Sequence, residues 1–263
     1  MNHRAGLALI KSTWASWMQY RSFFFVLAFG WMIPPLVALF AWLAAAGDGD
    51  LGGMDRGAFV AYYLALVLAN QLTYAQTNWT LGDVIRMGGL NAWLVRPLPA
   101  LYNVFASEVA GKVVYLVFVI PVAALLALFL RPELTTTPAR VALALVSLLL
   151  AWALRFFWGC WLALLAFWST RADALLTVQD SLVFLLSGIA APVMLLPGVL
   201  QTLSRVLPFR YMVGFPVEIL VQRLPAEEIL FGLAMQLGWL GLALALTGVV
   251  WRAGLRHYAA VGG

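Results

Sequence analysis

The sequence predicts an all-α, polytopic membrane protein with six transmembrane helices in a single domain, residues 1–263. Apolar residues make up 64% of the chain and charged residues 10%, whereas soluble domains are typically about 45–50% apolar and about 25% charged. The long apolar runs are continuous rather than alternating, which favours helices over a barrel. Twelve Trp residues fit the aromatic belts found at the two interfaces of a membrane.

Residues 1–21 precede the first apolar run and are predicted to form an amphipathic helix at the membrane interface. The interpretation depends on helical spacing, which places one set of side chains roughly on one face and a polar set largely elsewhere. A cytoplasmic extension of the first span is the alternative. The apolar set is Leu7, Ile10, Trp14, Trp17 and Met18, and the polar set is Lys11, Ser12, Gln19 and Arg21.

Six apolar runs meet the length of about 20 residues that a transmembrane helix needs. The third is expected to be extended at its start by residues 106–112. The fourth is interrupted only by Arg155, and the fifth contains Asp180. The runs are residues 22–46, 57–78, 113–130, 141–170, 174 to about 196, and 229–251.

The charges between these runs predict which side of the membrane each segment faces. An even number of spans places both termini on one side. If that side is the cytoplasm, the inner segments hold nine basic and three acidic residues, and the outer segments hold six basic and seven acidic residues. This asymmetry favours cytoplasmic termini. The net charge of +5 then marks the cytoplasmic membrane face and not a nucleic-acid partner.

Residues 197–228 are neither a span nor an ordinary loop. The segment PGVLQTLSRVLPFRYMVGFPVEILVQRLPAEE is too apolar for a free external loop and too interrupted by proline to cross a membrane. We expect short external helices that re-enter the membrane surface and are buried by protein where the backbone is irregular.

The chain lacks the motifs of the common hydrolases. Its two histidines, His3 and His257, stand near the two ends of the sequence, and neither H-E-x-x-H nor G-x-S-x-G occurs, so a zinc or Ser-His enzyme is excluded. The sequence also has no G-x-x-x-x-G-K-[ST], so no P-loop of its own binds ATP. We expect no directly bound cofactor and no metal site.

Arg155 and Asp180 are the ionisable residues within the predicted spans. Such residues usually face the interior of the bundle and find partners there. One interpretation is a substrate path or gating pair. The other is a structural salt bridge, or an arginine bonded to backbone carbonyls. The surrounding stretch WALRFFWGCW, which includes Trp158, could line a cavity for flat or cationic compounds, although aromatic residues in a span usually pack.

The stretch DVIRMGGLNAWLVRPLPALYNVFASEVAGKV, residues 83–113, resembles the cytoplasmic connection between the second and third spans of type-2 ATP-binding-cassette (ABC) permeases. Gly89–Leu90, Leu94, Pro97 and Gly111–Lys112 stand at the positions of the family pattern, and Asn91 stands where an acid is common. Three further phrases resemble those of a bacterial six-span branch, so the resemblance covers essentially the whole chain. They are AFWSTRADAL at 166–175, LPFRYMVGFPVEIL at 207–220 and WRAGLRHYAAVGG at 251–263.

The resemblance implies a permease subunit of an ATP-driven exporter in the bacterial inner membrane, moving an amphiphilic, hydrophobic or lipid-like compound such as a drug. It implies two ABC ATPase subunits that bind ATP and Mg, and a second permease, related or identical. Residues 80–112 would be the cytoplasmic coupling region, stiffened by its prolines. Within it the resemblance implies contacts through Asp83, Arg86, Trp93, Leu94, Arg96, Pro97 and Pro99, with Trp93 a better anchor than Leu94.

Two other functions stay open at this point. One is an ion-coupled secondary carrier that uses Arg155 and Asp180, although such carriers often show internal repeats and none is evident here. The other is a membrane scaffold that transports nothing.

Overall fold

The computed structural model describes residues 3–47, 49–75, 77–169, 172–222 and 224–258. Within these ranges the chain forms α-helices, two short 3-10 turns (η1 and η2) and connecting segments, and no strand. The helices are α1 (His3–Gln19), α2 (Arg21–Ala46), α3 (Arg56–Thr73), α4 (Thr77–Arg86), α5 (Leu90–Leu94), α6 (Leu101–Leu130), α7 (Pro138–Leu164), α8 (Ala172–Leu186), α9 (Gly198–Val206), α10 (Phe209–Val221) and α11 (Ala226–His257).

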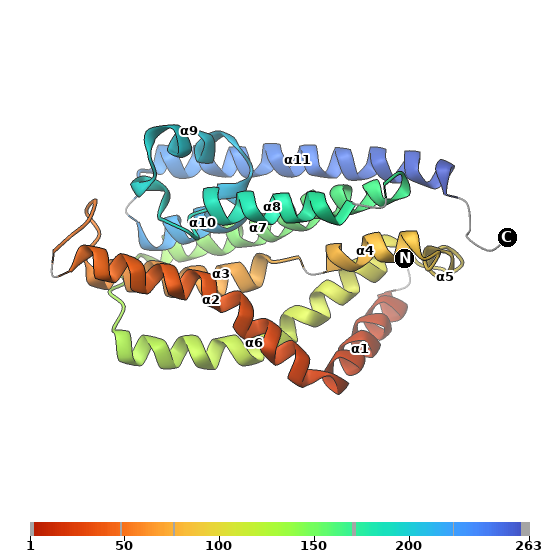
Figure 1. Cartoon of the computed structure of the whole chain (residues 1–263), viewed down its shortest axis with the longest axis horizontal. Coiled ribbons are helices and arrows are strands. Elements are labelled where there is room, and N and C mark those ends of the chain that lie inside the picture. The colour runs from red at the N-terminus through yellow and green to blue at the C-terminus, as the bar shows by residue number, and fades with distance from the viewer. Residues whose placement is uncertain (1–2, 48, 76, 170–171, 223, 259–263) are drawn as a thin grey trace.

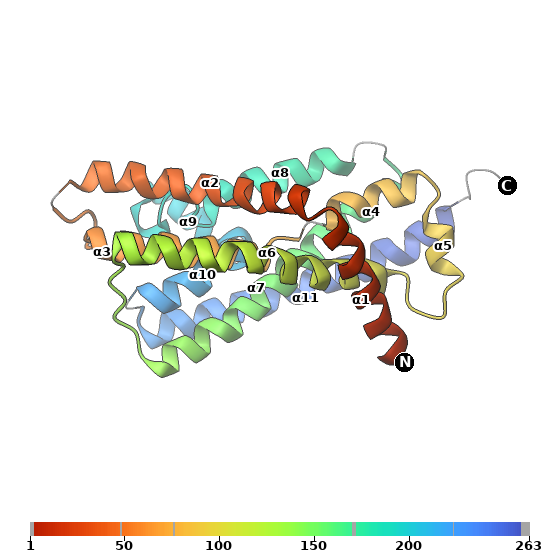
Figure 2. The ribbon, with the colours of Figure 1, turned by 90° about the horizontal axis from the view of Figure 1, so that it is seen from below.

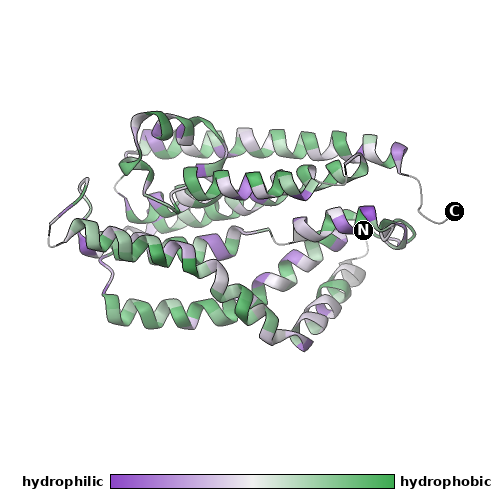
Figure 3. Cartoon of the chain, viewed as in Figure 1, coloured by the Kyte–Doolittle hydropathy of each residue, from purple (hydrophilic) through white to green (hydrophobic). Residues whose placement is uncertain are grey.

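The long helices run roughly along one axis of an elongated bundle (Figures 1 and 2). The start of α1, all of α5 and the end of α11 lie at one end, which we call the terminal end. The loop before α3, the segment 131–137 and helix α9 lie at the other, distal end. Hydrophobic residues cover most of the length of the long helices, and hydrophilic residues concentrate toward the two ends (Figure 3).

Five helical stretches of the described chain are long and apolar enough to cross a membrane. They agree with five of the six predicted spans and are Phe25–Ala46, Arg56–Arg86, Leu101–Leu130, Pro138–Phe167 and Ala226–His257. The predicted fifth span, 174–196, is α-helical only to Leu186. It ends there because Gly188 has a φ of 100°, which a right-handed helix cannot accommodate, and Pro192 follows. At 15 residues, α8 is about 22 Å long.

The predicted second span, 57–78, is broken. Helix α3 ends at Thr73 and α4 begins at Thr77. The Thr73 hydroxyl donates a hydrogen bond to the Ala69 carbonyl at 2.9 Å, a contact that bends helices. The Tyr74 carbonyl accepts a hydrogen bond from Lys112 Nζ at 2.7 Å instead of completing another helical turn. A side chain from a different helix therefore satisfies the carbonyl at the break.

Helix α6 starts at Leu101, five residues before the predicted extension of the third span, residues 106–112. Its first half carries Glu108 and Lys112, which are buried or nearly so. The two form an ion pair at 2.7 Å, one helical turn apart, so neither charge is left unpaired in the helix. An i, i+4 pair with the acid first is also the favourable order in a helix.

Helix α1 packs against the first half of α6. Close approach is possible because two glycines lie at the contact: Gly6 faces Tyr102, and Gly111 faces Trp17. The predicted apolar face is consequently divided. Trp17 packs inward, whereas Leu7 and Trp14 are exposed on the outer surface of the helix.

Helix α10 lies in the centre of the distal half and is buried from Phe209 to Ile219. Together with α3 it supplies the largest fully buried side chains of this core, including Tyr62, Tyr63, Tyr211 and Phe215. The segment 197–228 is thus two short helices, α9 and α10, of which the second is a core element.

Replacing Gly214 with Ala is expected to destabilise this core by about 1–3 kcal/mol, the usual cost of overpacking. A Cβ atom at Gly214 would stand 1.8 Å from the backbone oxygen of Ser187, and neither backbone can move without disturbing α10. The control is Gly241→Ala, because nothing lies within 4 Å of a Cβ there. The thermal unfolding midpoint of purified protein should fall for Gly214→Ala only. Equal midpoints for both variants would contradict the packing.

Candidate functional site

A buried polar cluster surrounds Arg155 of α7. The side chain is 3% exposed. Its Nη1 atom donates to Asn70 Oδ1 at 2.8 Å and to Thr73 Oγ1 at 3.4 Å, both at the end of α3. Its guanidinium carbon lies 4.9 Å from the centre of the Tyr74 ring. Arg155 is therefore anchored on the last turn of α3, at the break in the second span.

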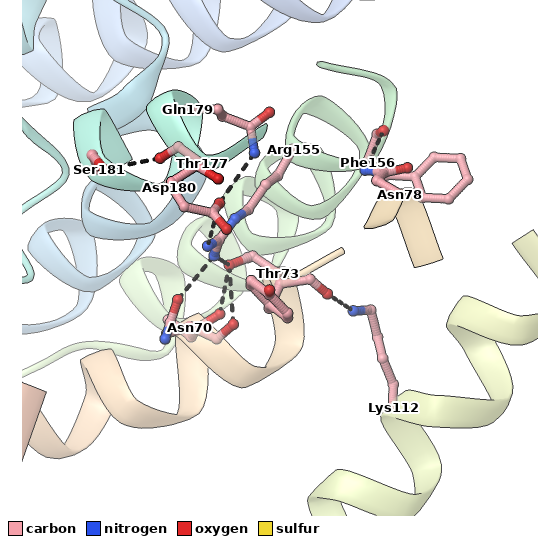
Figure 4. Close-up of polar contacts among 12 residues, drawn as sticks. Asn70, Thr73, Asn78, Lys112, Arg155, Phe156, Thr177, Gln179, Asp180 and Ser181 are labelled. Carbon is pink, nitrogen blue, oxygen red and sulfur yellow. Dashed lines mark hydrogen bonds and ion pairs between the residues drawn. The ribbon is translucent and has the colours of Figure 1, made fainter. Parts of the chain in front are cut away.

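Asp180 of α8 approaches the same guanidinium from another side (Figure 4). Its Oδ1 atom is 4.0 Å from Arg155 Nη2 and accepts a hydrogen bond from Gln179 Nε2 at 3.2 Å. The structure thus brings the two predicted residues together, but Asn70 is nearer to Arg155 than Asp180 is. Asn70 is absent from the sequence-based set because an amide in an apolar run carries no charge to mark it.

The cluster extends to α6 through Lys112. This lysine bonds the Tyr74 carbonyl and pairs with Glu108, each at 2.7 Å. The four charges Arg155, Asp180, Lys112 and Glu108 balance in sign. The cluster joins α3, α6, α7 and α8 where the backbone of the second span is irregular, and irregular backbone within a membrane is tolerated where protein buries it.

Trp158, predicted as a possible cavity-lining residue, packs elsewhere. Its ring centre lies 5.7 Å from those of Trp161 and Trp239 and 6.5 Å from that of Phe209, in edge-to-face geometry. Such contacts fill space between α7, α10 and α11.

At the terminal end, Asp83 and Arg86 connect α4 to α8. Arg86 contacts Asp83 in its own helix through Nη2 and donates from Nη1 to Asp173 Oδ1 at 2.9 Å. Asp173 lies in the first turn of α8. The family resemblance implies contacts with a partner for Asp83 and Arg86, and the structure places them in this link between two helices of the chain.

Beyond α4 the chain forms a projecting turn around α5. Leu90 is fully buried and Trp93 is half-buried, packed against the core of this end. Arg96 is exposed and donates to Asn103 Oδ1 at 3.0 Å. Three apolar side chains are exposed; these and the neighbouring polar and proline residues are called the terminal-end surface. It consists of Met87 (80% exposed), Leu94 (42%), Val95 (84%), Arg96, Pro97 and Pro99.

From the sequence Trp93 is expected to be a better anchor than Leu94, but Leu94 is the more exposed of the two side chains. Trp93 contributes to the core, whereas Leu94 points outward. Met87 and Val95 are missing from the predicted set, because their helical and turn positions could not be assigned to a face from the sequence alone.

Among the described residues no group of three or more His, Cys, Asp and Glu side chains could hold a metal ion. The sequence model of the family described as "ABC-2 family transporter protein" matches residues 30–262. No curated protein matches the chain.

Proposed function

Because the chain belongs to the ABC-2 family of transporter proteins, we propose that it is the permease of a bacterial ATP-driven exporter of amphiphilic, hydrophobic or lipid-like compounds. A permease of this family works with an ATP-binding-cassette subunit, which hydrolyses the ATP. We propose two such subunits, which bind ATP and Mg, and a second permease, related or identical.

One observation carries the coupling role that we propose for residues 83–99. Met87 and Val95 expose most of their apolar surface on either side of α5, which lies at the terminal end of the bundle (Figure 1). Clustered apolar side chains rimmed by polar residues are typical of a protein-binding site. The prolines at 97 and 99 limit the bending of the turn. A displacement of the terminal-end surface by the ATPase subunit is therefore transmitted to α4 and α6.

The proposed topology has six crossings, with both ends of the chain in the cytoplasm of a bacterial inner membrane. The basic residues near the terminal end support this orientation. In this arrangement α8 provides the fifth crossing together with the segment that follows it, α9 lies on the external side, and α10 re-enters the core of the bundle.

The terminal-end surface can be tested with Val95→Asp, alone and with Arg96→Glu. Removing a hot-spot contact costs about 2 kcal/mol or more, which is about 30-fold in affinity. The amount of ATPase subunit that copurifies should fall accordingly, and substrate-stimulated ATP turnover in vesicles should be lost. The matched control is Val199→Asp on α9, which is 75% exposed but lies at the distal end.

Normal ATPase binding and stimulated turnover in Val95→Asp with Arg96→Glu would rule out this surface as the coupling element. The wild-type purification also separates the alternatives, because a secondary carrier or a scaffold would copurify with no ATPase. Elution of each variant as a single species confirms that it is inserted and folded.

A further inference from the structure

An apolar groove lies in the distal half of the bundle between α3, α6 and α7, with α10 as its floor. Its volume is about 510 Å³, and only apolar residues line it. Small side chains create the space: Ala65 and Ala69 on α3 face Ala123, Ala124 and Ala127 on α6. An empty apolar space forfeits the dispersion contacts of its walls, so filling this one with apolar groups is favourable.

The length and depth of the groove match one leaflet of a bilayer. Its wall on α3 extends from Ala61 to Leu72, which is about 16 Å at the rise of an α-helix. The hydrocarbon core of a bilayer is about 30 Å thick. The groove begins near the distal ends of α3, α6 and α7 and reaches approximately the middle of the membrane.

The lining fits a hydrocarbon chain as the occupant. The walls offer it only methyl and methylene groups, mainly from alanine and leucine.

The distal rim of the groove is where a polar group attached to such a chain would lie. The rim is the extended segment after α6, whose side chains alternate. Pro132 and Leu134 face the groove, whereas Glu133 and Thr135 face a second cavity of about 550 Å³. Apolar and polar surfaces thus meet at this rim, at the depth in the membrane where the acyl chains of a lipid join its headgroup.

We propose that this groove binds one acyl chain of a lipid from the distal leaflet. The site goes beyond the proposed function, because it requires neither the ATPase nor a transported substrate. The buried position of α3 makes it testable: Ala61, Leu64 and Ala69 are nearly inaccessible, so a lipid chain can contact them only by entering the groove.

The probe is phosphatidylcholine with a diazirine in the middle of one acyl chain, incorporated in phosphatidylcholine vesicles with the full-length protein. After illumination, mass spectrometry should find lipid adducts on peptides from α3 as well as on the exposed face of α6. Adducts on α6 around Leu128 without any on α3 would overturn the proposal, because the chain would then lie outside the groove.

Two variants and a control test the same site by filling it. Ala65→Phe or Ala124→Phe should lower the yield of α3 adducts several-fold and leave adducts elsewhere unchanged. Ala245→Phe, an exposed alanine on α11, should change nothing. Unchanged α3 labelling in both folded groove variants would also overturn the proposal. If one variant fails to fold, the other approaches the groove from the opposite wall.

Discussion

Replacing Arg155 with Met is expected to destabilise the protein by about 3–5 kcal/mol, the cost of removing one partner from a buried charged network. The change leaves Asn70 without its 2.8 Å donor and leaves Asp180 without a nearby positive charge. Arg155→Lys is the control. Lysine keeps the positive charge but lacks the planar guanidinium group with its several N–H donors. The loss of stability should therefore be smaller than for Arg155→Met. The measurement is the unfolding midpoint in detergent, together with transport in vesicles.

Double-mutant cycles can rank the partners of Arg155. Combining Arg155→Met with Asp180→Leu should cost less than the sum of the two single changes, and combining it with Asn70→Leu should show the larger coupling. Contacting residues typically couple by about 0.5–3 kcal/mol, and the Asn70 contact is shorter than the 4.0 Å approach of Asp180. Strictly additive losses for Arg155 and Asp180 would mean that they do not interact.

Replacing Arg210 with Met is expected to have a comparable effect at the distal end. Its Nε and Nη2 atoms donate to Glu218 Oε2 at 2.9 and 2.6 Å, and Nη2 also reaches Glu228 Oε1 at 3.3 Å. Arg210 and Glu218 are almost completely buried. Without the arginine Glu218 becomes an unpaired buried charge, so we expect a loss of about 3–5 kcal/mol in the free energy of unfolding.

Arg205→Met is the matched control for this second prediction. Arg205 contacts the same Glu228, but at 3.9 Å and with its side chain 55% exposed. Exposed ion pairs of this kind contribute about 1 kcal/mol at most. If Arg210→Met and Arg205→Met lower the unfolding midpoint equally, the buried ion pair does not hold α10 in place.

The positions of the spans could be predicted because hydrocarbon requires a continuous apolar run of sufficient length. Three of the five candidate spans in the described chain agree closely with the predicted runs, and the fourth predicted run keeps Arg155 near its middle, as expected. The sequence also predicts the extension of the third span across residues 106–112, but not residues 101–105 of α6. Glu108 and Lys112 are accommodated in this extension because they pair.

Tertiary contacts also explain the remaining differences at the candidate site. An apolar run shows that residues 57–78 can be helical, but the partner that interrupts the helix at Tyr74 is Lys112, 38 residues later. Which of the side chains of Trp93 and Leu94 packs inward depends on which side of a five-residue helix contacts the core. Periodicity cannot assign a face in so short an element.

The break between α3 and α4 has a consequence for the order in which the protein assembles. In hydrocarbon an unsatisfied backbone carbonyl costs several kcal/mol, and the partner of the Tyr74 carbonyl belongs to a helix that is synthesised later. While α6 is still absent, residues 70–77 satisfy their backbone best as a continuous helix. We therefore expect the irregular shape of the second span to be acquired after its synthesis, when Lys112 arrives. The arginine of α7 is synthesised later still.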